Sequence, residues 1–358
     1  MKRYGWLLGC CLFLSIGMLW AADEPDLRML QQKAAQSRDM EGYVGVCKYL
    51  YQTEENPELL LLYADSIHQL ATKSKKPEQL VEYYIWASEG NFIKGDFQQG
   101  YALKRKAIAL AEKAGLKFAI SQSCCDMGYY CNVDARYDSA RYYFRKGLEA
   151  GEDLSEAGEA CRTMLTNYAS SFLFEGKTDS ALVYTIRASE RSAADKDTAM
   201  LIENLNQLGT IYRRKKNLEN CIANFEQALH LCELRGNHNA VAFIYGNIAT
   251  AYCDWNRPVD AIPFSEKAVE YALKTGNKRR IGTCYVNLGA IQIRLVQMRA
   301  EGIATLLKAI PILEEVNDRR LLCDAYNYLV NAYRMDGNLN QAMYYLQKLD
   351  KLAHDMQT

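Results

Sequence analysis

The sequence predicts an all-α solenoid, a stack of helical hairpins, and three observations support this. From about Glu78 onward the chain repeats with a period of 40 or 41 residues. Each period contains two apolar patterns of helical spacing. Residues that favour turns separate the patterns. A fixed period with two helical patterns indicates stacked hairpins, because one hairpin cannot bury its apolar face alone.

The composition excludes two classes of protein. The 358 residues include 43 Lys and Arg and 43 Asp and Glu, so the formal net charge is zero. This balance argues against a nucleic-acid partner, which needs a basic surface to displace phosphate counterions. Hydrophobic residues make up 49% and charged residues 24%, which is typical of a folded chain and excludes wholesale disorder.

Residues 1–22 have the layout of a signal peptide. Lys2 and Arg3 precede an uncharged run that ends with the small residues Ala21 and Ala22. The run of 19 residues is just long enough to cross a bilayer, so an uncleaved membrane anchor is the alternative. Both interpretations predict a periplasmic or cell-envelope protein, and only the anchor predicts a membrane partner.

Small residues mark the repeat from residue 78 onward. One set of anchors follows an apolar residue, and it consists of Ser88, Gly128, Ala169, Gly209, Ala249, Gly289 and Val330. Twelve positions later most copies have a second small residue: Gly100, Ala140, Ala181, Cys221, Ala261 and Ala342. Helices approach to ~8–10 Å only where the crossing points carry small side chains. We therefore expect helix crossings here, with aromatics such as Phe144, Tyr184 and Phe225 filling the wedges between hairpins.

Turn residues recur at the expected boundaries. Asn217 and Asn256 separate helices within a unit, and Gly236–Asn237 separates one unit from the next. The unit that begins near Lys278 departs from the pattern. Its second small residue comes one position late, at Gly302, which predicts a one-residue insertion.

These offsets resemble the tetratricopeptide repeat family, with the closest agreement at Gly209–Tyr212, Cys221, Phe225 and Ala228. The resemblance covers residues 78–358 as seven repeats of about 40 residues, longer than the family's usual ~34. Residues 23–77 are expected to form an N-terminal helical cap with a degenerate repeat. The resemblance implies a right-handed superhelical solenoid of helix-turn-helix repeats, in an exported bacterial form.

No pattern in the sequence indicates catalysis, a metal or a cofactor. The segment Gly176–Thr178 looks like the end of a phosphate-binding loop, but Ser171 stands where that loop requires its first glycine. The four histidines are scattered over different units: His68, His230, His238 and His354. We therefore predict no enzyme activity, no metal and no cofactor.

Ten cysteines follow the leader, and none of them forms a CxxC pair. Buried thiols are the first interpretation. In an exported protein, however, Cys124 with Cys161 and Cys284 with Cys323 are candidates for disulfides between neighbouring repeats.

In this family the first helix of each repeat lines a concave groove. Two positions before the anchors the sequence has Asp126, Asn167, Gln207, Asn247, Asn287 and Tyr328. Amide side chains suit the main chain of an extended peptide. The resemblance to long-unit relatives such as kinesin light chain implies such an asparagine ladder. The alternative is that the amides bond to the next hairpin and hold the pitch of the superhelix.

The candidate peptide-binding residues are Asn167, Gln207, Asn247, Asn287, Arg213, Arg214, Arg294 and Arg334. The arginines are either partners for a ligand carboxylate or solvated helix ends. The N-terminal half of the groove has acidic and aromatic residues at corresponding positions: Glu82, Glu89, Asp126, Trp86, Phe92 and Tyr129. Each of the aromatics is a ligand contact or part of the packing between repeats.

The last expected helix, residues 338–354, contains the run Met343–Leu346. Four neighbours at 100° steps cannot all face one partner helix, so we expect this helix to self-associate or to dock on a partner. The leading hypothesis is a non-enzymatic scaffold of the bacterial cell envelope that binds an extended protein or peptide segment. The alternative is a sensory input domain of an envelope signalling regulator, shortened or acting through a separate partner.

Overall fold

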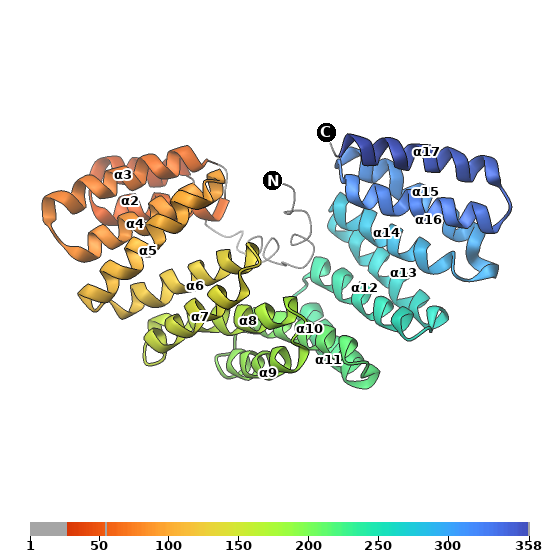
Figure 1. The fold of residues 1–358 in the computed structure, drawn as a ribbon, viewed down its shortest axis with the longest axis horizontal. Helices are drawn as coiled ribbons and strands as arrows, with labels where there is room; N and C mark the ends of the chain where they lie inside the picture. The colour runs from red at the N-terminus through yellow and green to blue at the C-terminus, as the bar shows by residue number, and fades with distance from the viewer. Residues whose placement is uncertain (1–26, 54–55, 357–358) are drawn as a thin grey trace. The chain divides into compact units, whose positions relative to one another are not determined.

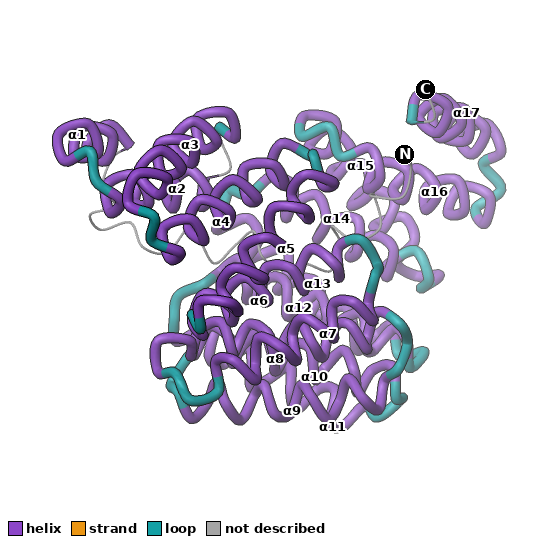
Figure 2. The backbone as a smooth tube through the Cα atoms, turned by 60° about the vertical axis from the view of Figure 1, so that its left-hand side comes forward, coloured by secondary structure: helices purple, strands orange, loops and turns teal. Residues whose placement is uncertain are grey.

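The computed structural model describes residues 27–53 and 56–356, and they form helices joined by short loops, with no strand in these ranges (Figures 1 and 2). The contacts divide the chain into two compact units, one up to Ala194 and the other from Asp195. The predicted all-α stack of helical hairpins is confirmed. The predicted leader, residues 1–22, lies outside the described residues, and no described helix is long and apolar enough to cross a membrane.

Unit 1 contains nine α-helices and one short 3₁₀ helix within its described residues. They are α1 (Leu27–Ser37), α2 (Met40–Thr53), α3 (Pro57–Ser74), α4 (Pro77–Lys94), α5 (Phe97–Ala114), α6 (Lys117–Val133), α7 (Tyr137–Gly151), η2 (Ser155–Ala157), α8 (Gly158–Phe174) and α9 (Thr178–Ala194).

Unit 2 continues the same arrangement of paired helices. Its elements are α10 (Thr198–Arg214), α11 (Leu218–Leu234), α12 (His238–Asp254), α13 (Pro258–Thr275), α14 (Lys278–Gln292), η3 (Val296–Met298), α15 (Arg299–Glu315), α16 (Arg319–Met335) and α17 (Leu339–Asp355). The extra residue predicted near Gly302 falls in the turn between α14 and α15, where η3 lies.

Most loops between the described helices end one helix with a left-handed residue, and several start the next helix with a side-chain cap. Gly236, at φ 65°, follows α11, and a side chain would be strained there. Asn237 comes next, and its Oδ1 accepts from the N–H of Ala240 at 3.0 Å. Asn217 caps α11 in the same way, with 3.0 Å to the N–H of Asn220. The predicted turn residues therefore act as helix caps.

Two kinds of contact hold the helices of a pair together. At the glycine anchors Gly128 and Gly209 the ring sixteen positions later packs directly on the glycine, and at Gly289 the side chain of Leu306 packs there instead. These rings, Phe144 and Phe225, are 0% exposed. We expected these rings to fill the space between hairpins. They also pack within their own hairpin, against its glycine anchor.

Where the anchor is alanine or valine, the ring moves one position and stacks on an aromatic three positions after the anchor. Phe172 and Tyr184 stack at 5.4 Å and 4°, and Tyr252 and Phe264 at 5.3 Å and 17°. Tyr333 and Tyr345 repeat this geometry at 5.8 Å and 6°. A methyl group at the anchor displaces the ring, and the second aromatic supplies the surface that the glycine supplied elsewhere.

Within each unit, the first helices of successive pairs contact one another, as α6 does α8 and α12 does α14. No comparable contact joins successive second helices among the described residues. The first helices therefore lie on the inner side of the bend in each unit. We call this side the first-helix face: α2, α4, α6 and α8 in unit 1, and α10, α12, α14 and α16 in unit 2.

All ten cysteines of the described residues are free thiols, so the disulfide alternative is wrong. The pair Cys124 and Cys161 shows the reason. A Cβ placed on Gly147 would meet Cys124, and one on Gly151 would meet Cys161, at 2.9 Å in each case. Both cysteines thus pack against the glycines of α7, as the buried-thiol interpretation expected.

The glycine contact can be tested with two substitutions in unit 2. An alanine Cβ at Gly209 would lie 2.5 Å from the buried ring of Phe225, while Gly246 on α12 has no atom within 4 Å of that position. We expect Gly209→Ala to destabilise the fold by about 1–3 kcal/mol through overpacking. Gly246→Ala should stabilise it by about 0.5–1 kcal/mol, because alanine favours a helix. Urea unfolding followed by circular dichroism measures both; equal effects would contradict the packing described.

Candidate functional site

The candidate residues predicted from the sequence fall in both units. Asn167 lies on α8 in unit 1, and the other amide positions lie on α10, α12 and α14 in unit 2. The candidate amides all belong to first helices, as the repeat alignment requires, whereas the candidate Arg294 lies in the turn after α14. The surroundings of these amides, however, differ from one helix to the next.

In unit 2 the amides serve the scaffold to different extents. Asn247 donates from Nδ2 to Oδ1 of Asn206 on the preceding first helix at 2.7 Å. Gln207, the residue aligned with Asn247, is half-buried and makes contacts of its own. Asn287 is exposed, and no hydrogen bond joins its amide to another described residue. The scaffold role thus holds at Asn247, while Asn287 keeps its hydrogen-bonding capacity.

In unit 1 two neighbouring amides are buried with unused atoms. Asn132 on α6 is 5% exposed and Asn167 is 7% exposed. Nδ2 of Asn132 donates to the main-chain oxygen of Asn167 at 3.0 Å. Oδ1 of Asn132 and Nδ2 of Asn167 have no hydrogen-bond partner among the described residues. An acceptor on α6 and a donor on α8 are therefore left unsatisfied, an uncommon and costly state for buried polar atoms.

The four candidate arginines do not share one environment. Nε of Arg213 lies 3.5 Å from Oδ2 of Asp254 on the next first helix. Arg214 is exposed at the end of α10 and makes contacts of its own. Arg294 is exposed beside the thiol of Cys253, and Arg334 is exposed near the end of α16. The proposed capture of a ligand carboxylate by these arginines stays a prediction.

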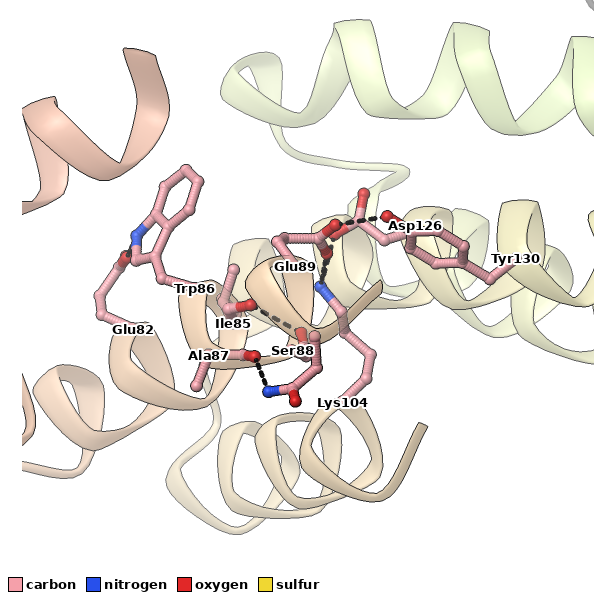
Figure 3. A network of polar contacts seen from close by, with 10 residues as sticks. Glu82, Ile85, Trp86, Ala87, Ser88, Glu89, Lys104, Asp126 and Tyr130 are labelled. Atoms are coloured by element: carbon pink, nitrogen blue, oxygen red, sulfur yellow. Dashed lines mark hydrogen bonds and ion pairs between the residues drawn. The ribbon is translucent and has the colours of Figure 1, made fainter. Parts of the chain in front are cut away.

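A buried charged network joins three helices of unit 1 (Figure 3). The ammonium of Lys104, on α5, is 0% exposed and pairs with Glu89 on α4. It also lies 2.9 Å from Oδ2 of Asp126 on α6. The hydroxyl of Tyr130, one turn further along α6, donates to Oε2 of Glu89 at 2.7 Å. One lysine thus faces two carboxylates.

The pKa shifts in this network follow from burial and charge. Burial alone lowers the pKa of Lys104, but the charges of Asp126 and Glu89 outweigh it and raise that pKa above its ordinary value. Burial raises the pKa of Glu89, against the opposing effect of Lys104. Lys104 therefore stays protonated and cannot act as a base or a nucleophile, which requires a lowered pKa.

Aromatic side chains surround the network. The indole N–H of Trp86 donates at 3.0 Å to Glu82, which lies two turns before the network on α4. The ring of Tyr51, on α2, meets that of Trp86 edge to face at 6.2 Å. The ring of Phe92 stacks on that of Tyr130 at 3.6 Å and 16°. Trp86 and Phe92 are buried, so they pack between repeats, whereas Tyr51 is 36% exposed.

Sequence reasoning named Glu89 and Asp126 but missed Lys104 and Tyr130. A signal for Lys104 was present. It lies in the buried stripe of α5, which otherwise consists of Gly100, Tyr101, Leu103, Ala107, Ile108 and Ala111. A lysine inside such a stripe is buried and needs a carboxylate partner. The identity of its partners was not readable, because they come from other helices.

Two further features of the described residues bear on function. No group of three or more His, Cys, Asp and Glu side chains is placed to hold a metal ion. On α17 only Ala342 and Tyr345 are buried, while Met343, Tyr344 and Leu346 are 55%, 48% and 38% exposed. Self-association through this apolar surface stays a prediction.

The family model that matches this chain is the tetratricopeptide repeat, over residues 197–274, which contain α10 to α12 and all of α13 except Thr275. Residues 197–274 are tetratricopeptide repeats. The helix pairs on either side repeat the same architecture. No curated protein sequence matches the chain.

Three solved structures show the same fold. The apo form of RapI has 11% identity and a TM-score of 0.65, over 92% of this chain and 91% of that one. The apo form of the quorum sensor NprR from B. thuringiensis has 16% identity and a TM-score of 0.61, over 91% and 92%. Aspartyl phosphate phosphatase F from Bacillus subtilis has 15% identity and a TM-score of 0.57, over 91% and 88%. At these identities the similarity shows that this chain has a tetratricopeptide-like solenoid fold.

Replacing Lys104 tests the buried network. Lys104→Met leaves Glu89 and Asp126 without their cation, and we expect a loss of about 3–5 kcal/mol near neutral pH. Lys104 opposes the rise that burial causes in the pKa of Glu89, so this pKa is higher in the folded variant than in the folded wild type. Protonation of Glu89 at lower pH therefore stabilises the variant more than the wild type, and the loss should shrink as the pH falls. Urea unfolding at about pH 8 and about pH 5 measures this.

Lys106→Met is the matched control, since Lys106 lies on the same helix but is exposed. It should change the free energy of unfolding by no more than about 0.5 kcal/mol at either pH. A Lys104→Met variant as stable as the wild type at the higher pH would show that the network is not a buried ion pair.

Proposed function

We propose that this protein is a non-enzymatic scaffold of the bacterial cell envelope that binds an extended protein or peptide segment on its first-helix faces. The observation that carries this proposal is unused amide capacity on these helices. Asn287 is exposed without a hydrogen bond to another described residue, and Asn132 and Asn167 hold an acceptor and a donor unpaired. A peptide group offers both a donor and an acceptor, so it complements such amides.

The non-enzymatic role is supported by the state of the polar groups that the fold gathers. In unit 1 the lysine is held protonated between two carboxylates. In unit 2 the candidate residues are amides and arginines, which neither attack substrates nor transfer protons near neutral pH. The fold is shared with a phosphatase, so the argument rests on these side chains and not on the architecture.

A second function, sensory input to a signalling system, is supported by fold alone. NprR is named a quorum sensor. Another structure of this fold is a signal-transduction ATPase from Pyrococcus horikoshii with a tetratricopeptide repeat sensor. It has 16% identity and a TM-score of 0.62, and this chain spans about half of its length, 52%. In a sensor the binding of a segment is transmitted to another protein, so this function includes the binding step proposed above.

Peptide binding is tested by selection from a displayed random peptide library. The full chain should enrich a set of peptides. We expect one of two variants to bind these peptides about 2–10-fold more weakly than the wild type, because one hydrogen bond contributes about 0.5–1.5 kcal/mol. The variants are Asn167→Ala for unit 1 and Asn287→Ala for unit 2. Asn220→Ala, an exposed position on the second helix α11, is the control and should change nothing. Peptides indifferent to both variants would place binding away from the first-helix faces.

Location in the envelope is tested with the leader itself. Residues 1–30 fused to alkaline phosphatase, which is active only after export, should give enzyme activity in a Gram-negative host. Substitution of Asp for Leu12 and for Leu14 should abolish it, since the apolar run drives export. The mass of the full chain recovered from the envelope then distinguishes a cleaved leader from an anchor. A fusion that is produced in the host but has no phosphatase activity would refute the proposed location.

A further inference from the structure

The charges of the network in unit 1 do not balance. Lys104 supplies one positive charge, and Glu89 and Asp126 supply two negative ones. No other basic side chain of the described residues pairs with either carboxylate. Glu82, a third carboxylate two turns before Glu89 on α4, accepts only the indole N–H of Trp86. With both carboxyl groups ionised, the network therefore carries one negative charge more than Lys104 neutralises, in a partly desolvated place where charge interactions are strong.

The uncompensated charge is accessible at one point. Glu89 and Lys104 have side-chain exposures of 2% and 0%, whereas the side chain of Asp126 is 23% exposed. Asp126 lies two positions before the anchor of α6, where other first helices carry amides. Figure 3 shows one oxygen of Asp126 directed away from Lys104 and the other directed into the network. A cation that approaches the first-helix face thus meets Asp126 first.

An exposed tyrosine, Tyr51, lies against α4, where its ring meets that of Trp86 edge to face at 6.2 Å. Tyr51 keeps 36% of its surface exposed. The enclosure of its hydroxyl, followed by the charges of Glu89 and Asp126, raises its pKa well above the ordinary value, so the hydroxyl stays neutral. An aromatic face beside a carboxylate favours ammonium and guanidinium groups through cation–π attraction.

A separate observation indicates that the cation belongs to a peptide. The unpaired Oδ1 of Asn132 and Nδ2 of Asn167, each on a side chain more than nine-tenths buried, lie where α6 meets α8. Asn132 follows Asp126 by six residues on α6, about 9 Å along the helix axis. An extended chain covers that distance in about three residues. If both side chains turned toward the first-helix face, Oδ1 of Asn132 could accept from the N–H of a peptide group. Nδ2 of Asn167 could donate to the C=O of the same group.

We infer that unit 1 binds a lysine or arginine of an extended peptide, with the cation at Asp126 beside Tyr51 and a peptide group about three residues away at Asn132 and Asn167. This inference rests on the proposed function and names the chemistry of the segment bound. It differs from the arginine positions of unit 2, which suit an acidic ligand group. The positive charge of the bound lysine or arginine would neutralise the carboxylate charge that Lys104 does not.

The experiment uses peptides selected by the full chain from a displayed random library. Some of these peptides should bind the Asn167→Ala variant more weakly than the wild type. We expect these peptides to share a basic residue at one fixed position. One such peptide is then made with lysine and with norleucine, which has a similar shape and no charge. Affinities for the wild type and Asp126→Asn form a double-mutant cycle. The lysine peptide should lose about tenfold in affinity when Asp126 is changed, and the norleucine peptide should lose little.

Two further variants separate binding from folding. Tyr51→Leu, at an exposed position, should weaken the lysine peptide about threefold, as expected for one cation–π contact, and leave the norleucine peptide unchanged. Asp254→Asn, the acidic control on the first helix α12 of unit 2, should leave both peptides unchanged. Thermal unfolding checks that each variant is folded.

The outcomes distinguish this inference from the proposed function. Selected peptides that bind the first-helix face of unit 1 without a basic residue overturn the cation site and leave peptide binding standing. Equal losses for the lysine and norleucine peptides in Asp126→Asn also overturn it. A wild-type chain that selects no peptide overturns both.

Discussion

The close approach of two helices within each pair is the constraint on which this structure depends. It is reached at the anchor position, where a small residue lets an aromatic ring of the second helix lie against the first. Glycine anchors take the ring directly, as at Gly209 and Phe225. At alanine anchors the ring comes 15 positions after the anchor instead of 16, and it stacks on a second aromatic of the first helix, as Phe264 does on Tyr252. The period of the chain follows from this, since every pair has to place the same contact at the same distance from its turns.

Contacts between pairs are more polar and more varied. Asn247 reaches back to Asn206 at 2.7 Å, and Arg279 reaches Asp318 at 2.8 Å. Such contacts fix how one pair sits on the next within a unit, and they use side chains that would otherwise face solvent. The amides left over are therefore informative. An amide such as Asn287, which the next pair does not use, is available for a ligand, while Asn247 is partly committed to the scaffold.

The Lys104 network differs from these contacts, because its charged groups are buried and would not otherwise face solvent. Burying one ammonium against two carboxylates is seldom the most stable choice for a helix interface, because apolar residues of similar size pack without a desolvation penalty. An alanine or leucine in the α5 stripe would preserve the pairing of α4 and α5. The network instead places a carboxylate at the first-helix face of unit 1 and holds it rigidly through Lys104 and Tyr130. Its form fits a recognition surface better than a stabilising device.

The sequence by itself determined the helices, their pairing and the crossing points. These depend on local spacing, and residues such as Gly209 and Asn237 act within one pair or one turn. Tertiary structure alone decided which polar groups meet. Asn247 pairs with Asn206 and not with the aligned Gln207, and Lys104 finds partners 15 and 22 residues away on two other helices. The physical reason is that a helical pattern specifies which face a side chain occupies, whereas the rotation and offset of neighbouring helices select the atom it reaches. A shift of one residue on the facing helix exchanges one partner for another without changing the pattern that both helices display.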